Sequence, residues 1–212
     1  VDASADELYL GGSANGIKIS KGGDLILLGT ATVWDDVRVD VLTTKLGGND
    51  PGFSIFKDNG AGSRGVWTYW FDKAAIEEVF FSVQFPHSWD STAITPHVHW
   101  VPKTADATGL LTVEWGLEYT WVNTDGTFGN TAIVYAKSAA GLTTASKHIK
   151  TDFAAIVPGA GTQDGISSMM LCRLFRNATD AVDDTYDDDA GLLEFDIHFA
   201  LNTMGSRQIT IK

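Results

Sequence analysis

The segment from Leu111 to Trp121 alternates apolar and polar residues with a period of two. Its odd-numbered positions are Leu, Val, Trp, Leu, Tyr and Trp, whereas Thr, Glu and Gly occupy the positions between them. Successive side chains of a β-strand point to opposite faces, so this pattern predicts a strand with one face on a core and the other directed outward.

Three further segments repeat this alternation, and no window shows apolar residues at a sustained helical spacing. The sequence therefore predicts an all-β fold, a jelly-roll-like antiparallel β-sandwich, with a Greek-key sandwich of another topology as the alternative. The inward positions predicted in these segments are Val79, Phe81, Val83 and Phe85, then Val98 and Trp100, and finally Leu193, Phe195, Ile197 and Phe199.

Residues 1–31 differ from the rest of the chain, because short apolar runs alternate there with glycine-rich turns. Strands of three or four residues cannot bury a core alone, so we expect an N-terminal β arm that packs on the sandwich or on copies of itself in an oligomer. The sandwich is predicted to span residues 32–212. Interface positions are predicted at Leu8, Leu10, Ile17, Ile19, Leu25 and Leu27 of the arm, and at Trp67 and Tyr69 of a segment that is apolar on both faces.

The formal net charge of −12 bears on the choice of partner. A polyanion repels phosphate backbones and anionic headgroups, so neither nucleic acid nor a membrane is expected as a partner. The N-terminus shows no secretory signal pattern, and no apolar run is long enough to cross a bilayer. Cys172, the only cysteine, lies in an apolar stretch, which predicts a core residue in a protein made in the cytoplasm.

The candidate metal ligands are His97, His99 and Glu114. Alternation places both imidazoles on one face of a strand over residues 96–102. A hairpin between this strand and residues 111–121 would set Glu114 opposite His97, and two histidines with a carboxylate suit Zn²⁺. The alternative is an outward polar face or a subunit interface with His97 hydrogen-bonded to Glu114. We favour that alternative, and expect no metal and no cofactor.

An acidic segment near the C-terminus is the second candidate cation site. Its carboxylates are dense enough for Ca²⁺, but they lack the spacing of an EF-hand loop, so a solvated loop is the favoured interpretation. The segment contains Asp180, Asp183, Asp184, Asp187, Asp188 and Asp189.

The sequence contains no motif of the common hydrolases, zinc proteases or nucleotide-binding enzymes. Glu114 and Glu118 share a strand face, but at about 3.3 Å per residue they lie ~13 Å apart, which is too far for a pair of glycosidase carboxylates. We therefore expect a protein that is not an enzyme and has no catalytic residues.

Nine short runs punctuate the chain between residues 32 and 207. They are TVWDDVRV at 32–39, TKLG at 44–47, DPGF at 50–53, FKDNG at 56–60, YWFD at 69–72, PHVHW at 96–100, WGLEYTW at 115–121, CRLFR at 172–176 and AGLLEFD at 190–196. In these runs the chain resembles a family of tailed-phage virion structural proteins. The resemblance implies a jelly-roll protein located on the virion and assembled as a homotrimer, with an arm similar to the short β-repeats of trimeric phage appendages.

Two functions are consistent with this resemblance. The first is a capsid decoration, cement or head-fibre protein that packs against the major capsid protein or other virion proteins, for which buried interface area rather than a pocket is required. The second is a tail-associated protein that binds a host-surface glycan through exposed aromatic side chains.

Overall fold

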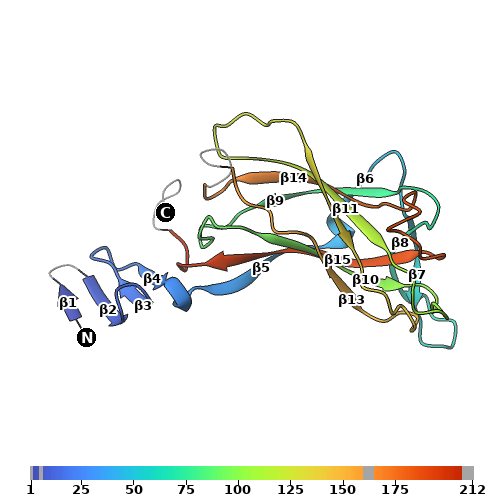
Figure 1. The fold of residues 1–212 in the computed structure, drawn as a ribbon, viewed down its shortest axis with the longest axis horizontal. Helices are drawn as coiled ribbons and strands as arrows, with labels where there is room; N and C mark the ends of the chain where they lie inside the picture. Colours follow the sequence, from blue (N-terminus) through green and yellow to red (C-terminus); the bar gives the residue numbers. More distant parts are fainter. Residues whose placement is uncertain (1, 5–6, 160–164, 207–212) are drawn as a thin grey trace.

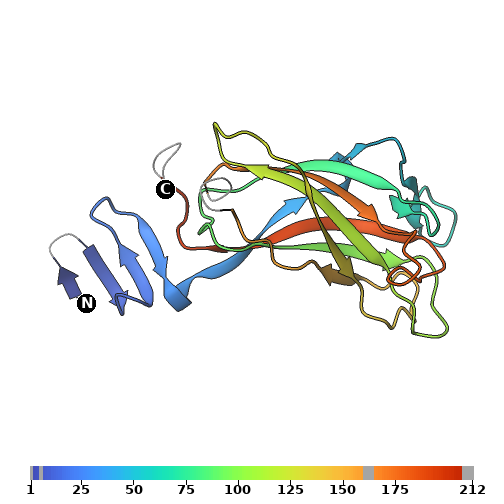
Figure 2. The ribbon, with the colours of Figure 1, turned by 45° about the horizontal axis from the view of Figure 1, so that its top comes forward.

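The computed structural model describes residues 2–4, 7–159 and 165–206, and nearly all of its regular structure is β-strand (Figure 1). The strands form three antiparallel sheets. Two sheets stack as a sandwich, and the third stands at one end of the molecule (Figures 1 and 2). The prediction of an all-β antiparallel sandwich is confirmed. The helical segments of the described residues are two single 3₁₀ turns, η1 Gly29–Ala31 and η2 Val41–Thr43.

The N-terminal sheet is a four-stranded meander. Gly11 and Gly16 face each other where β2 turns into β3, and both have positive φ angles, 100° and 147°. A Cβ on Gly16 would lie 2.5 Å from the carbonyl oxygen of Leu10, so only glycine fits this turn. The sheet touches the sandwich through β4, where the Leu27 N–H donates to the Asn202 carbonyl over 2.7 Å. In order, the strands are β1 Asp2–Ser4, β2 Glu7–Gly11, β3 Gly16–Ile19 and β4 Leu25–Leu28.

The first sheet of the sandwich has the order β13-β10-β15-β8-β7. Strand β15 is long enough to take two partners along one edge: Ala190 to Leu192 pair with β8, and Phe195 to Leu201 pair with β5. The strands of this sheet are β5 Val33–Val39, β7 Gly52–Lys57, β8 Val66–Phe71, β10 Thr95–Pro102, β13 Ile149–Asp152 and β15 Ala190–Leu201.

The second sheet has the order β12-β11-β14-β9-β6, and its longest strand, β11, contains most of the alternating segment 111–121. Its strands are β6 Lys45–Leu46, β9 Glu78–Gln84, β11 Glu114–Val122, β12 Ala132–Lys137 and β14 Met169–Arg176.

The core lies between these two sheets and is rich in aromatic rings. Phe85 stacks on Trp121 with ring centroids 4.6 Å apart, and Trp89 packs against both. Large aromatic side chains dominate core energetics because each removes about 150–250 Å² from water. Cys172 is also buried, as predicted, and burial raises the pKa of its thiol. Of the predicted inward positions, Val79, Val83, Phe85, Val98, Trp100, Val113, Trp115, Leu117, Trp121, Phe195, Ile197 and Phe199 are buried.

One predicted inward residue is misplaced. The register between β10 and β15 shifts after His99, so that Glu194 faces His99 while Leu192 faces Trp100. Leu193 is thus the extra residue of a bulge and lines the outer face, whereas Leu192 is buried. A bulge moves a side chain to the other face without a sign in the alternation, because both residues are leucine.

The predicted hairpin between residues 96–102 and 111–121 is also wrong. Strands β10 and β11 lie in different sheets, and the chain between them crosses the end of the sandwich. Asp106 holds this crossing: its N–H donates to the Leu142 carbonyl over 2.8 Å, and its carboxylate accepts the N–H groups of Thr108 and Leu111. Burial opposes ionisation of Asp106, but the hydrogen bonds that its carboxylate accepts from the Thr108 hydroxyl and from backbone N–H groups outweigh it and lower its pKa to about 2.

Within the described ranges, no helix has the length and apolar character needed to span a membrane.

Candidate functional site

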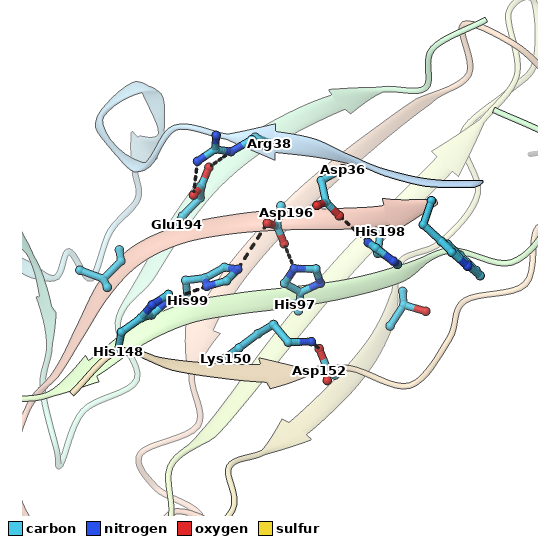
Figure 3. A pocket seen from close by; sticks show the side chains of 13 residues that line it. Asp36, Arg38, His97, His99, His148, Lys150, Asp152, Glu194, Asp196 and His198 are labelled. Atoms are coloured by element: carbon cyan, nitrogen blue, oxygen red, sulfur yellow. Dashed lines mark hydrogen bonds and ion pairs between the residues drawn. The ribbon is translucent and has the colours of Figure 1, made fainter. Parts of the chain in front are cut away.

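The candidate site lies on the outer face of the first sheet, where β13, β10, β15 and β5 run side by side (Figure 3). On β10, His97 and His99 flank the fully buried Val98 and so point outward. Asp196 of β15 is directly opposite His97 in the register. Opposed residues of antiparallel strands share a face, so Asp196 lies among the imidazoles.

Both carboxylate oxygens of Asp196 face a histidine. Nε2 of His97 is paired with Oδ1, and Nε2 of His99 lies 3.4 Å from Oδ2. These groups are largely removed from solvent: His97 is 6% exposed and Asp196 is 5% exposed. Nδ1 of His97 is buried and has no hydrogen-bond partner among the described residues, so the hydrogen bonding of this ring is incomplete.

A third histidine reaches the cluster from the strand on the other side of β10. His148 immediately precedes β13, and its Nε2 lies 2.7 Å from Nδ1 of His99. One of these two nitrogens donates and the other accepts. The contact fixes the ring of His99 with its remaining nitrogen, Nε2, directed toward Asp196 (Figure 3).

A fourth histidine forms the rim. His198 hydrogen-bonds Asp36 over 2.6 Å, and its ring stacks on Trp34 with centroids 4.9 Å apart and planes 7° from parallel. Four of the five histidines of the chain therefore line one open hollow of about 860 Å³.

The other charged groups of the hollow are already paired. Arg38 donates two hydrogen bonds to Glu194, at 2.5 and 2.7 Å, and Lys150 is paired with Asp152. The histidines are thus the groups of the hollow that pair with the carboxylate of Asp196. Burial opposes protonation of His97, but the hydrogen bond and charge of Asp196 outweigh it and raise its pKa. Burial lowers the pKa of His99.

Glu114, the third predicted ligand, is not part of this site. It begins β11 in the opposite sheet, and its side chain accepts a hydrogen bond from Asn177 over 2.6 Å. Its carboxylate converges instead with those of Asp180 and Asp183. Burial raises the pKa of Glu114, and the charges of this acidic segment add to the effect.

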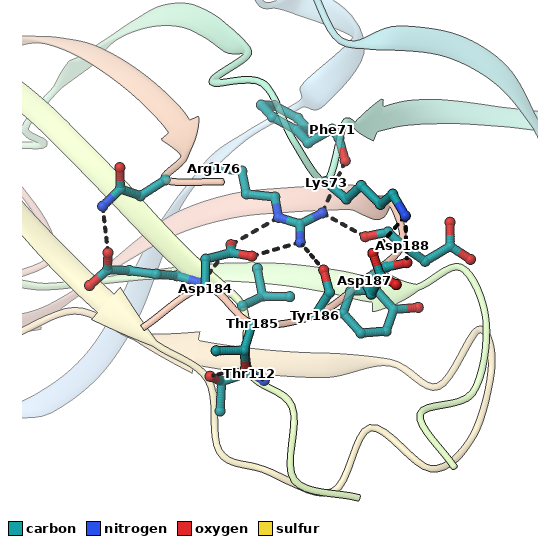
Figure 4. Close-up of polar contacts among 12 residues, drawn as sticks. Phe71, Lys73, Thr112, Arg176, Asp184, Thr185, Tyr186, Asp187 and Asp188 are labelled. Atoms are coloured by element: carbon teal, nitrogen blue, oxygen red, sulfur yellow. Dashed lines mark hydrogen bonds and ion pairs between the residues drawn. The ribbon is translucent and has the colours of Figure 1, made fainter. Parts of the chain in front are cut away.

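The prediction of a solvated loop is wrong for Asp184, because the acidic segment closes around a buried arginine (Figure 4), whereas the side chain of Asp187 is 82% exposed. The guanidinium of Arg176 is 0% exposed, and Asp184 accepts two hydrogen bonds from it, at 2.9 and 2.7 Å. Its remaining N–H groups reach the carbonyls of Phe71, Tyr186 and Asp188. Further ion pairs tie the segment to neighbouring elements: Asp183 with Lys137, Asp187 with Lys73 and Asp189 with Lys103.

The six predicted interface residues of the arm share one face of the N-terminal sheet. The register aligns them in two cross-strand rows, and each is half-buried or exposed. The other face carries Glu7, whose carboxylate accepts hydrogen bonds from Tyr9 and Lys18. The two rows are Leu8, Ile19 and Leu25, and then Leu10, Ile17 and Leu27.

The predicted interface residues of β8, Trp67 and Tyr69, lie at the other end of the molecule. The rings of both contact Phe53 of β7, and Trp67 remains 46% exposed. Within the single chain, both faces of β8 are covered only in its second half. There Thr68, Trp70 and Phe71 are buried, whereas Val66 and Trp67 at its start are exposed.

Sequence reasoning found His97 and His99 but missed the residues that complete both polar clusters. Asp196 alternates with the buried Phe195 and Ile197, so the sequence predicts that its side chain points outward. It does not predict that His97 lies opposite on the next strand. His148 lies in a segment without a clear pattern. Arg176 ends the run CRLFR, and alternation places it on the same face as the buried Cys172 and Leu174, but an arginine is rarely expected in the interior.

Comparison with known proteins found no relative of the chain, because neither the protein-family models nor the curated proteins searched contain a match.

Proposed function

We propose that the chain is a structural protein of a tailed-phage virion, a trimeric capsid decoration, cement or head-fibre protein that acts through assembly rather than catalysis. The aliphatic face of the N-terminal sheet is the observation that carries this proposal. Six leucine and isoleucine side chains lie on that face, and none of them is buried within the chain.

This face favours a second copy of the chain as its occupant. The apolar face of a sheet is stabilised when another layer covers it, and fully burying a leucine or isoleucine contributes about 1.5–3 kcal/mol. The aliphatic rows carry no charge, so identical faces can meet without desolvating ions. The polar contacts of Lys18, Glu7 and Tyr9 lie on the opposite face, which suits solvent.

The far end of the sandwich supplies a surface for other virion proteins. Phe53, Ile55 and Trp67 share a face of β7 and β8, and each is 45–47% exposed. Clustered exposed aromatic residues are typical of protein interfaces. We assign this patch to contact with the major capsid protein or another virion component.

The strand order supports the jelly-roll interpretation. The last strand, β15, lies between β8 and β10 in one sheet, and β14 lies between β9 and β11 in the other. Two interlocked Greek keys have this arrangement. Rigid bodies of this kind present loops and edges at fixed positions, which suits a protein that bridges neighbours in a shell.

Light scattering on the full chain tests the assembly. We expect a trimer, and we expect Leu10→Lys to dissociate it because three ammonium groups would be buried in the apolar contact. Val182→Lys is the matched control: Val182 is also exposed and apolar but lies in the acidic segment, so the trimer should persist. A monomeric wild-type chain would refute the assembly.

Truncation separates two roles of the arm. If a chain that begins at Thr32 is monomeric, the arm is the assembly element. If it remains trimeric, the arm docks on the particle instead. In either case, adding the protein to phage particles that lack it should raise the temperature at which they release DNA.

A second function is favoured by one observation in the hollow. Trp34 is 57% exposed at its rim, beside carboxylates and imidazoles, which is the arrangement in which aromatic rings stack on sugars. If the chain is a tail-associated glycan-binding protein, Trp34→Ala should abolish binding to host cells and leave the oligomer intact. A decoration protein predicts no such loss.

A further inference from the structure

We propose that His97, His99 and Asp196 form a binding site for a divalent transition metal, for which Zn²⁺ is the best match. One ligand atom from each of the three residues lies within 4.8 Å of the other two. They come from two adjacent strands whose register places them on one face, so the backbone holds the three groups together without a loop.

The spacing of these atoms is close to that of a metal site. Bonds of about 2.0–2.1 Å from zinc to nitrogen and oxygen place neighbouring ligand atoms ~3.3 Å apart in a tetrahedron. Nε2 of His99 and Oδ2 of Asp196 are 3.4 Å apart. Nε2 of His97 lies closer to Oδ1, and rotation of the Asp196 carboxylate opens this contact when an ion enters.

The donor set selects the kind of metal. Two imidazoles and one carboxylate match zinc sites with three protein ligands, whereas Ca²⁺ and Mg²⁺ prefer shells made of oxygen. The fourth position faces the open hollow. A water molecule or a group from another molecule can therefore complete the coordination.

Charge favours an ion at the same point. Asp196 is nearly buried, and the neighbouring cations Arg38 and Lys150 are paired with Glu194 and Asp152. Buried carboxylates require a positive partner. A metal ion bound to the two imidazoles supplies that charge.

His148 acts as a positioning residue for this site. Metal-bound histidines usually hydrogen-bond a second group through their other ring nitrogen, and that contact fixes the tautomer and the ring orientation. The 2.7 Å contact between Nδ1 of His99 and Nε2 of His148 has this form. When the Nδ1–H of His99 donates to His148, the Nε2 lone pair faces Asp196 and the ion.

The second group of carboxylates carries no such site, although Glu114, Asp180 and Asp183 also converge. Glu114 accepts from Asn177, Asp183 is paired with Lys137, and Asp180 accepts the N–H groups of Val182 and Asp183. Glu114 therefore serves as the control for non-specific binding to acidic residues.

Zinc titration of the full chain tests the proposal. After dialysis against EDTA and then buffer, isothermal titration calorimetry with ZnCl₂ should give one ion per chain. His99→Gln, which keeps hydrogen-bonding capacity but is a poor metal ligand, should weaken affinity at least 100-fold, as should Asp196→Asn. His148→Ala should weaken affinity about 10–100-fold and keep the stoichiometry of one. His87→Ala and Glu114→Gln should bind as the wild type does.

Two further readouts do not depend on the heat of binding. Co²⁺ should give the visible absorption bands of a tetrahedral site in the wild type and in His148→Ala, but not in His99→Gln. Zn²⁺ should raise the Tm of the wild type, and EDTA should reverse the rise. Circular dichroism confirms that each variant is folded. The proposal is overturned if the wild type does not bind zinc, if His99→Gln and Asp196→Asn both retain full affinity, or if Glu114→Gln loses as much as they do.

Discussion

Arg176 and Asp196 are both buried ions on strands of the sandwich, but their partners differ in kind. Arg176 meets the carboxylate of Asp184 and three backbone carbonyls, so that all its N–H groups are engaged. Asp196 meets two histidines, and the ring of His97 keeps an unpartnered nitrogen within the described structure. The first cluster is complete as folded, whereas the second depends on protons or on a metal ion.

The difference separates a structural role from a binding role. A buried ion pair with every hydrogen bond satisfied fixes one conformation, because any movement leaves a charge unpaired. A carboxylate among imidazoles tolerates several states of charge, because histidine gains or loses a proton near neutral pH. The acidic segment around Arg176 is therefore expected to be rigid, and the hollow around Asp196 to be adaptable.

The largest expected effect comes from breaking the complete cluster. Arg176→Ala leaves Asp184 buried without a partner, and we expect the free energy of unfolding to fall by about 3–5 kcal/mol. Arg173→Ala is the matched control on the same strand, because the side chain of Arg173 is 25% exposed and pairs with Glu78 and Glu118. It should lose about 1 kcal/mol or less. Urea denaturation measures both, and equal losses would remove the distinction between the clusters.

A smaller difference is expected between the two aspartates. Asp184→Asn leaves the guanidinium of Arg176 without its counter-charge and should destabilise the fold by ~3 kcal/mol or more. Asp196→Asn should lose about 1 kcal/mol in EDTA at pH 8, because its amide oxygen still accepts from histidines that can be neutral. Thermal and urea unfolding compare the pair. A larger loss for Asp196→Asn would mean that the hollow is as essential to folding as the arginine cluster.

The smallest effect is a pH dependence confined to the hollow, measured in EDTA. His97 faces the titratable groups Asp196, His99, Lys150, Asp36 and His198, and its pKa is raised above 6.5. Protonated His97 therefore stabilises the fold below pH 6.5, and this contribution disappears as the pH rises through the raised pKa. His97→Asn should lose more stability at pH 5.5 than at pH 9.

His99→Asn should show the opposite trend, because the pKa of His99 is lowered below 6.5. The folded protein favours the neutral form of His99, so the free energy of unfolding of the wild type decreases as the pH falls below 6.5. Asparagine has no proton to gain, so the variant avoids this decrease. Unfolding curves between pH 5.5 and 9 test both variants. Parallel pH profiles for the two would contradict this account of the hollow.

The sequence could predict which face of a strand is buried but not which strand lies beside it. Alternation correctly places His97 and His99 on one face, but the sequence predicts Glu114 as their neighbour because its strand follows next along the chain. The structure pairs β10 with β13 and β15 instead. Strands joined by a short loop often form a hairpin. Here the loop between β10 and β11 crosses to the opposite sheet, and the hydrogen bonds of Asp106 hold it in that conformation.

Arg176 and Leu193 show a second limit. Arginine is rarely fully buried, so its residue type argues against an interior position. The burial of Arg176 is possible because five acceptor oxygens, from Asp184 and three other residues, bind its N–H groups. Leu193 and Leu192 are identical in chemistry, so only the bulge between β10 and β15 decides which one is buried.

The sequence by itself determined the fold class, the aromatic core and the separate N-terminal sheet, because alternation and glycine turns act between residues a few positions apart. The tertiary structure alone decided that Asp196 and His148 join His97 and His99, and that the acidic segment closes on Arg176. Strand pairing is chosen by the packing of two whole sheets, and the groups that it brings together are distant in the chain. Their chemistry therefore exists only in the folded protein.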